Sequence, residues 1–222
     1  MRRVSRQVDR TGMKADAKTR LLRTGARIVH QKGFNDAGLQ EILEEAQVPK
    51  GSFYFYFKSK EDFGLQLIDY FADFYLNRAD EMSSTRGGTY LERLRRYLDW
   101  QGDYMEANGY QGGCPFGNLS QEMADRNDRF REKLQDVFSR LRDRIARTLT
   151  AAQEAGEIDS ALDPRETADC ILSAWQGVLI QMKVAKNGYS RRAFHHMVFD
   201  RLLASPTGTQ RETDVQPSGL KR

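Results

Sequence analysis

The chain has 222 residues, of which 39% are hydrophobic and 30% charged, so it can fill the core of one or two domains beneath well-solvated surfaces. No apolar run approaches the roughly 20 residues needed to cross a bilayer, and the Arg-rich start lacks the apolar stretch of a signal peptide, so we expect a cytoplasmic protein without a membrane partner. Residues 1–60 carry 13 Lys and Arg against six Asp and Glu, a net charge of +7 beside −3 for the rest. This basic end is the natural place for contacts with phosphates.

The N-terminal quarter predicts a basic arm followed by three helices. Residues 1–15 hold scattered basic side chains without an apolar period and are expected to be flexible. Gly33 is expected to end the first helix, and Pro49 to separate the next two. The three predicted helices cover residues 18–32, 38–46 and 50–57. Two short helices across a tight break predict a helix-turn-helix within residues 16–60.

Residues 61–204 predict a second, larger helical domain. Ser59 is the expected N-cap of its first helix, and Pro164 is suited to the first position of a later one. The six predicted helices cover residues 60–82, 91–107, 115–123, 128–155, 164–185 and 190–204. Residues 205–222 are polar and rich in turn formers, and they are expected to be disordered. With no strand pattern, the fold class is all-α with about nine helices.

One run of residues carries a specific signature. Gly33-Phe34 and Leu39-Gln40-Glu41-Ile42 are followed by an unbroken stretch from Val48 to Glu61, with the sequence VPKGSFYFYFKSKE. This run closely resembles the TetR family of repressors, and it fixes residue type, order and spacing together over about a quarter of the chain. One departure is at Ala37-Gly38, where the family usually has a hydroxyl residue that caps the second helix, so a phosphate contact at this point is in doubt.

The resemblance implies an N-terminal helix-turn-helix domain followed by a ligand-binding and dimerisation domain. It further implies a homodimer that represses transcription by binding a palindromic operator in double-stranded DNA and that releases it when a small-molecule effector binds. Dimerisation agrees with the need for two reading heads on a palindrome. The last two long helices usually form the dimer interface in such proteins. Suitable residues are Ala174, Gly177, Val178, Phe194, Met197 and Val198, although a core within one subunit would use the same residues.

The residue types in the third helix can be read independently of the family. A recognition helix enters the major groove with its N-terminal end, so Lys50 is the best reader of bases or phosphates, and Gly51 allows close backbone approach. Hydroxyl groups can bind phosphate, and aromatic edges can touch a thymine methyl group. The expected DNA-binding residues are Gln40, Lys50, Gly51, Ser52, Tyr54, Phe55, Tyr56 and Lys60, with Gln40 and Lys60 resting on the resemblance. Phe53 and Phe57 are expected to pack inward, and a core role for Tyr54 and Tyr56 is the alternative.

The second domain holds a candidate sensor at Cys114. This residue follows two glycines and precedes Pro115, so it is the expected N-cap of a helix whose dipole and N–H groups would lower the pKa of the thiol. With Trp175-Gln176-Gly177 and Lys183, the segment is similar to a subgroup of TetR-like repressors that respond to reactive electrophiles, quinones or unsaturated acids. Lys183 would stabilise the thiolate or hold an acidic ligand. The alternatives are a small buried hydrophobe for Cys114 and a solvated charge for Lys183, while Cys170 is expected in the core.

Aromatic side chains of the second domain suggest an apolar ligand pocket. Its expected lining is Trp100, Tyr104, Phe116 and Trp175, with Glu122 or Gln176 as a polar anchor, although aromatic residues at helical spacing also fit an ordinary core.

Other functions are less well supported by the sequence. The three histidines, His30, His195 and His196, lack the spacing of a metal site or a nucleophile-base pair, so no enzyme, metal or cofactor is expected. A regulator with a noncovalent ligand or a protein effector, or an activator instead of a repressor, stays open.

Overall fold

The structure, a computed structural model, describes residues 16–84 and 87–204. The predicted basic arm at residues 1–15 and the predicted disordered tail at residues 205–222 lie outside these ranges. Every regular element within them is helical, as the sequence predicted. In chain order the elements are α1 (Ala17–Lys32), α2 (Leu39–Ala46), α3 (Lys50–Tyr56), α4 (Lys60–Ser84), α5 (Tyr90–Ala107), α6 (Pro115–Met123), α7 (Asp128–Glu154), α8 (Pro164–Ala185), α9 (Tyr189–Met197) and a π-helical turn at Val198–Leu202.

The helix ends follow from local chemistry. Ser59 Oγ accepts a hydrogen bond from the Asp62 N–H at 3.1 Å, as expected of the N-cap of α4. Thr89 and Glu92 form a reciprocal capping box at the start of α5. Gly33 ends α1 with a φ of 90°, a conformation that favours glycine. The departure noted at Gly38 is visible as well, because this N-cap of α2 makes no side-chain hydrogen bond.

The last predicted helix differs from the structure. The sequence predicted one helix over residues 190–204, whereas α9 ends at Met197 and a wider π-helical turn follows. The Leu203 N–H donates to the Val198 carbonyl oxygen at 2.8 Å, one residue further along than in an α-helix. Val198, Phe199 and Leu203 are buried where the helix widens. The spacing of apolar residues in the sequence does not reveal this widening.

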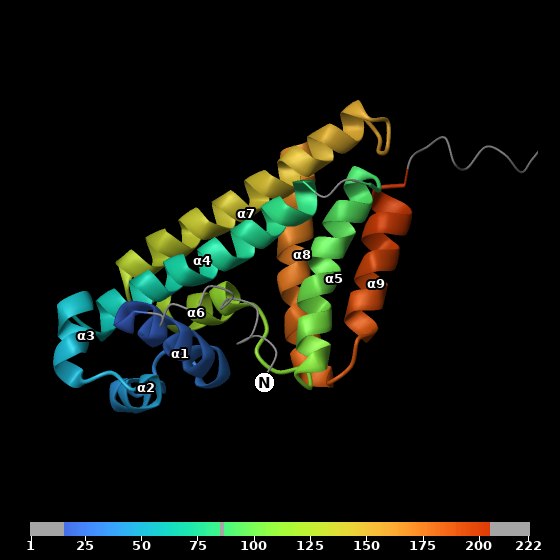
Figure 1. Cartoon of the computed structure of the whole chain (residues 1–222). Helices are drawn as coiled ribbons and strands as arrows, with labels where there is room; N and C mark the ends of the chain where they lie inside the picture. Colours follow the sequence, from blue (N-terminus) through green and yellow to red (C-terminus); the bar gives the residue numbers. More distant parts are fainter. Residues whose placement is uncertain (1–15, 85–86, 205–222) are drawn as a thin grey trace, which may run out of the picture.

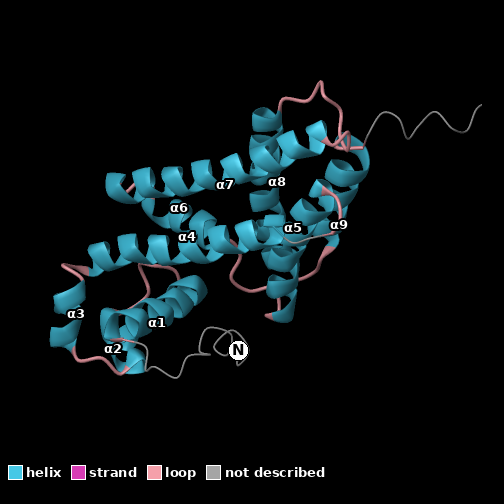
Figure 2. Cartoon of the chain, turned by 45° about the horizontal axis from the view of Figure 1, so that its top comes forward, coloured by secondary structure: helices cyan, strands magenta, loops and turns pink. Residues whose placement is uncertain are grey.

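The helices form a small N-terminal unit, α1–α3, and a larger unit over residues 61–204, named here the reading head and the sensor domain after the roles that the sequence predicts for them (Figure 1). Helix α4 leaves the reading head and runs beside α7 in both views, while α5, α8 and α9 form a bundle at the other end (Figures 1 and 2). The joint between α1 and α4 is tight, because a side chain at Gly25 would overlap the Phe63 ring. Helix α4 is therefore packed closely against the reading head from which it leads into the sensor domain.

Candidate DNA interface and effector pocket

Helix α3 presents an aromatic and basic surface to solvent. The side chains of Tyr54 and Phe55 are 53% and 82% exposed, and Lys50 and Gly51 are exposed beside them. Exposure of such large aromatic rings is costly unless a partner covers them. Ser52 and Tyr56 are half-buried.

Two other aromatic residues hold α3 in place. Phe53 and Phe57 are buried, which confirms that they pack inward, and both rings contact Phe63 of α4, with centroids 5.7 and 5.0 Å away. The orientation of the exposed face of α3 is therefore fixed by α4.

The two residues that were assigned to DNA by resemblance alone are placed differently from each other. Gln40 is exposed on α2 and donates to Glu44 at 2.8 Å. Lys60 is half-buried, and its Nζ donates to the Asn35 carbonyl oxygen at 3.1 Å and lies 5.1 Å from the centroid of the Phe34 ring. Burial lowers the pKa of Lys60. Its ammonium group is thus directed at the loop between α1 and α2.

Cys114 is the N-cap of α6 with Pro115 at the first helical position, which confirms its predicted location. The predicted lowering of its pKa is wrong. Burial raises the pKa of the thiol and outweighs hydrogen bonds from the Gly117 and Phe116 backbone and from the Gln176 side chain, which lower it. The core placement of Cys170 is also wrong, because this side chain is exposed on α8.

A cavity of about 30 Å³ adjoins Cys114. Of the predicted pocket residues, Cys114, Phe116, Trp175 and Gln176 line it. The Trp175 indole N–H donates to the side-chain oxygen of Gln101 at 3.2 Å, so the ring is held in one orientation. The lining also includes residues that the sequence did not single out: Tyr75, Ala79, Ser83, Arg93, Leu94, Tyr97, Leu98, Gln101, Leu141, Arg144, Ile145, Thr148 and Leu172.

Two residues that were expected to line the pocket, Trp100 and Tyr104, are not in this lining, and neither is Lys183, the candidate partner of Cys114 or of an acidic ligand. Trp100 forms a second layer, with ring centroids 5.5 Å from Tyr75 and 6.0 Å from Tyr97. Tyr104 is half-buried, and Lys183 is exposed on α8. Trp100 thus backs the lining instead of forming it, an arrangement that helical spacing does not reveal.

The start of helix α6 borders the cavity, and both of its ends contact the reading head. The Nε2 atom of His30 on α1 lies 2.8 Å from the carbonyl oxygen of Gly113, next to Cys114. At the other end, the Glu122 carboxylate accepts hydrogen bonds from the backbone N–H groups of Phe34 and Asn35 at 2.8 and 3.0 Å. Glu122 therefore faces the reading head and not the cavity, contrary to its suggested role as a pocket anchor.

The outer face of the bundle carries exposed small and apolar residues. Ala174 and Gly177 on α8 and Met197 on α9 are exposed, whereas Val178, Phe194 and Val198 are buried within the subunit. The suggested interface residues thus divide between surface and core. Ile180 and Val184 extend the exposed face with 48% and 75% of their side chains accessible.

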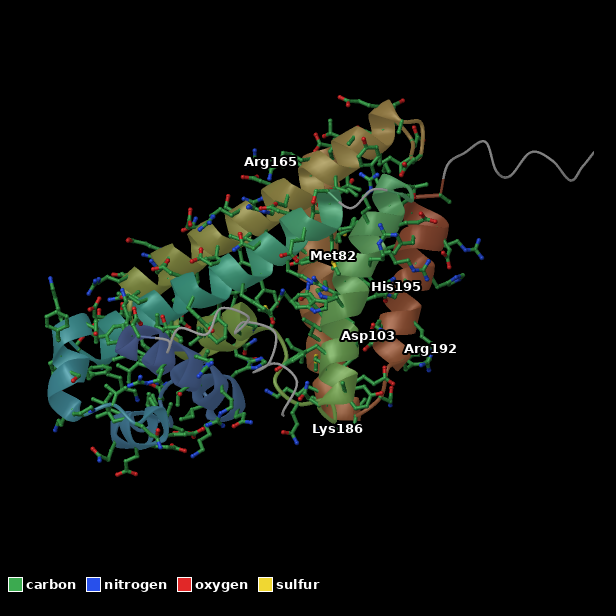
Figure 3. All side chains as sticks on the ribbon, viewed as in Figure 1. Met82, Asp103, Arg165, Lys186, Arg192 and His195 are labelled. Carbon is green, nitrogen blue, oxygen red and sulfur yellow. The ribbon has the colours of Figure 1, made fainter. Side chains whose placement is uncertain are left out.

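Of the two C-terminal histidines, His195 contacts another helix and His196 makes a local contact one turn along its own segment. His195 lies where α5 and α9 meet (Figure 3), with its Nε2 atom 2.9 Å from the Asp99 carboxylate, and His196 lies 3.5 Å from Asp200. Within the described ranges no group of acidic, histidine and cysteine residues could hold a metal ion. None of the described helices is both long and apolar enough to span a membrane.

Comparisons with known proteins agree with this two-part architecture. Residues 21–67 match the family described as bacterial regulatory proteins of the tetR family, and residues 91–197 match the tetracyclin repressor-like C-terminal domain. The transcriptional regulator AcuR of Cereibacter sphaeroides is 35% identical over 164 residues, which cover 74% of this chain and 75% of that protein.

Two further relatives extend the match. The HTH-type transcriptional repressor DhaR of a Mycobacterium species is 31% identical over 87% of this chain and 96% of its own length. The crystal structure of the reduced form of Escherichia coli NemR superposes with a TM-score of 0.80 at 28% identity, covering 86% of this chain and 99% of that one.

Proposed function

Because the chain belongs to the TetR family of bacterial regulatory proteins, we propose that it is a homodimeric repressor that leaves its operator when a small molecule enters the cavity beside Cys114. The observation that carries this proposal is the position of α6. Cys114 borders the cavity, and the adjacent Gly113 is held by His30 of the reading head. A molecule that displaces this turn therefore also disturbs the seat of the reading head.

The DNA-binding half of the proposal rests on α3. Lys50, Tyr54 and Phe55 would enter the major groove, with Gly51 allowing close backbone approach and Ser52 and Tyr56 meeting phosphates or thymine at the edges. Gln40 would contact the backbone from α2. The contact of Lys60 with Asn35 supports an indirect contribution, in which Lys60 positions the loop before α2.

The dimer would form through the exposed face of α8 and α9. A side chain at position 177 would meet no other atom within the subunit. The residue is nevertheless glycine, which lowers the stability of a helix. Close approach of a second α8 would give this glycine a function, and Ile180, Val184 and Met197 would be covered in the same interface. As a regulator of transcription, the dimer would act in the cytoplasm.

A covalent mode of action at Cys114 is the second candidate, favoured by the position of this thiol in the lining of the cavity, where an electrophile that enters would meet it. With an α,β-unsaturated carbonyl compound, the sulfur would form a bond to the β-carbon, and the α-carbon would take up the proton that the thiol gives away. The buried thiol has a raised pKa, so this reaction would be slow at neutral pH and would favour reagents small enough to enter.

The experiment that tests the proposed function is selection of bound fragments from the genomic DNA of the host, with and without candidate effectors suggested by the neighbouring genes. We expect one inverted repeat to be enriched and to be released by an effector. Release by an electrophile from wild type and Cys170→Ser but not from Cys114→Ser would establish the covalent mode. Equal release from all three would establish a noncovalent ligand. Enrichment of no specific sequence would overturn the proposal, and a need for a protein partner or activation of the target gene would revise it.

A further inference from the structure

The cavity beside Cys114 is small. A volume of about 30 Å³ leaves room for about two water molecules. Helices α4, α5, α7 and α8 and the start of α6 all contribute to its lining. A molecule larger than these waters must displace part of the lining. The weakest contact of the lining is therefore the one that we expect a ligand to break.

The charged groups in the lining are of one sign. Arg93 and Arg144 line the cavity, whereas no Asp or Glu among the described residues does so. The terminal nitrogens of Arg93 donate to the backbone carbonyl oxygens of Ser83 and Gly88, each at 3.2 Å, so none of the described carboxylates neutralises this guanidinium. The positive charge of Arg93 favours a ligand that carries a negative charge.

Arg144 has a carboxylate partner just outside the cavity. Its Nε and Nη2 atoms donate to the two oxygens of Asp80, each at 2.8 Å, in the bidentate geometry that binds carboxylates well. The hydrogen bonds from Arg144 lower the pKa of Asp80. The Asp80 side chain is 54% exposed, against 24% for Arg144, so the carboxylate can turn into solvent while the guanidinium stays. Arg144 is therefore the fixed member of the pair and Asp80 the exchangeable one.

The Asp80–Arg144 pair joins α4 to α7, and two other ion pairs do the same. Glu61 pairs with Arg129 at 2.9 Å, and Asp69 pairs with Lys133 at 2.7 Å. Neither of these pairs belongs to the cavity. Of these three ion pairs, a ligand in the cavity can thus reach only Asp80–Arg144, at the sensor end of α4, the helix that leads into the reading head.

We propose that the cavity binds a small monocarboxylate whose carboxylate group replaces Asp80 at Arg144 and so removes the ion pair that joins the sensor end of α4 to α7. The inference rests on the proposed function, because it names the class of effector and the contact through which that effector acts. Tyr97, whose buried phenol lies near both Arg144 and Cys114, forms the neighbouring wall, and Phe116 and Trp175 supply apolar lining. Loss of one of the three ion pairs between α4 and α7 would shift the balance between two orientations of the reading head.

The test uses sodium butanoate as the probe and butanamide as its uncharged counterpart, at equal ionic strength, with the melting temperature of the full chain as the readout. Butanoate at ten times its Kd should raise the melting temperature of wild type by about 4 °C, and butanamide should not. Arg144→Gln should abolish the shift. Asp80→Asn removes the competing carboxylate, so it should lower the butanoate concentration needed for half the shift by about fivefold or more.

The Asp69–Lys133 pair supplies matched controls on the same two helices. Lys133→Gln and Asp69→Asn should respond to butanoate as wild type does. Equal shifts with butanoate and butanamide, an equal loss in Lys133→Gln and Arg144→Gln, or an unchanged butanoate affinity in Asp80→Asn would each overturn the inference. Should Arg144→Gln fail to fold, the butanoate affinity of Asp80→Asn still tests the inference, because that variant keeps the guanidinium in place.

Operator binding separates this inference from the proposed function. Asp80→Asn should bind the operator about fivefold more weakly than Asp69→Asn, because it alone weakens the connection at the cavity. Specific operator binding by a protein that ignores butanoate would overturn only the inference, and the proposed function would stand. Absence of specific DNA binding would overturn the proposed function, even if butanoate bound at Arg144.

Discussion

The Nε2 atom of His30 lies 2.8 Å from the carbonyl oxygen of Gly113, which ties α1 of the reading head to the residue before Cys114. The ring also fills the space above Gly112, where a Cβ would overlap it. A displacement of Cys114 can thus be transmitted to α1 through the turn that contains Gly113. Because the two residues are 83 positions apart, this relationship belongs to the tertiary fold and not to any local pattern.

Replacing His30 by Gln should reduce the pH dependence of stability. Burial lowers the pKa of His30 below its ordinary value of 6.5. As the pH falls through 6.5, the unfolded chain binds a proton that the folded chain still excludes, so stability is present above this pH and declines below it. Gln keeps a donor for Gly113 but does not titrate.

Urea unfolding at pH 7.5 and 5.5 measures this effect. The loss of stability on acidification should be smaller in His30→Gln than in wild type. A remainder is expected from His195, whose pKa is also lowered by burial. Identical losses in the two proteins would show that His30 does not contribute.

Removing the Glu122 carboxylate should loosen the second link between α6 and the reading head. Glu122→Ala leaves the N–H groups of Phe34 and Asn35 without their acceptor, so we expect a loss of about 1 kcal/mol in the free energy of unfolding. Glu132→Ala, at an exposed position on α7, is the control and should change stability by less than about 0.5 kcal/mol. Equal values for the two variants would mean that the Glu122 contact does not stabilise the fold.

The sequence predicts the elements well but only part of the effector pocket. Helix limits follow from local signals such as Gly33, Ser59 and Pro164, which act within one turn of the chain. The lining of the cavity does not follow from such local signals. Tyr75, Tyr97 and Arg144 belong to three different helices, and only the packing of these helices brings the three side chains together.

The two cysteines show how tertiary packing overrides a local signal. The N-terminal end of α6 does stabilise a charge on Cys114, as expected, but burial opposes it more strongly. For Cys170, one residue along a helix turns the side chain by about 100°. Ile171 faces the core with no exposure, whereas its neighbour Cys170 faces away from it.

A charge on the exposed face of α8 should dissociate the proposed dimer. Val184→Glu would bury an unpaired carboxylate in the interface, so we expect a monomer in sedimentation experiments and weaker binding to a palindromic operator. Gln135→Glu adds the same charge at an exposed position on α7 and should stay dimeric. A dimeric Val184→Glu protein would place the interface elsewhere.

Deleting residues 1–14 should weaken binding to operator and random DNA by about the same factor. This basic segment is expected to contribute attraction to phosphates without reading sequence, so the dependence of binding on salt should become shallower. Fluorescence anisotropy at several salt concentrations measures both quantities. A loss of discrimination between the two DNAs would instead assign groove contacts to the arm.

The central claim is that the exposed face of α3 reads an operator, and titration of the selected inverted repeat with wild type and with Lys50→Ala/Tyr54→Ala tests it most directly. Both side chains are exposed, so the double variant should keep the helix content and dimer size of wild type. We expect its affinity for the operator to fall to that for random DNA of equal length, because each lost base contact costs about 1–3 kcal/mol. Retained preference for the operator in a folded, dimeric double variant would contradict the assignment of α3 as the reading helix.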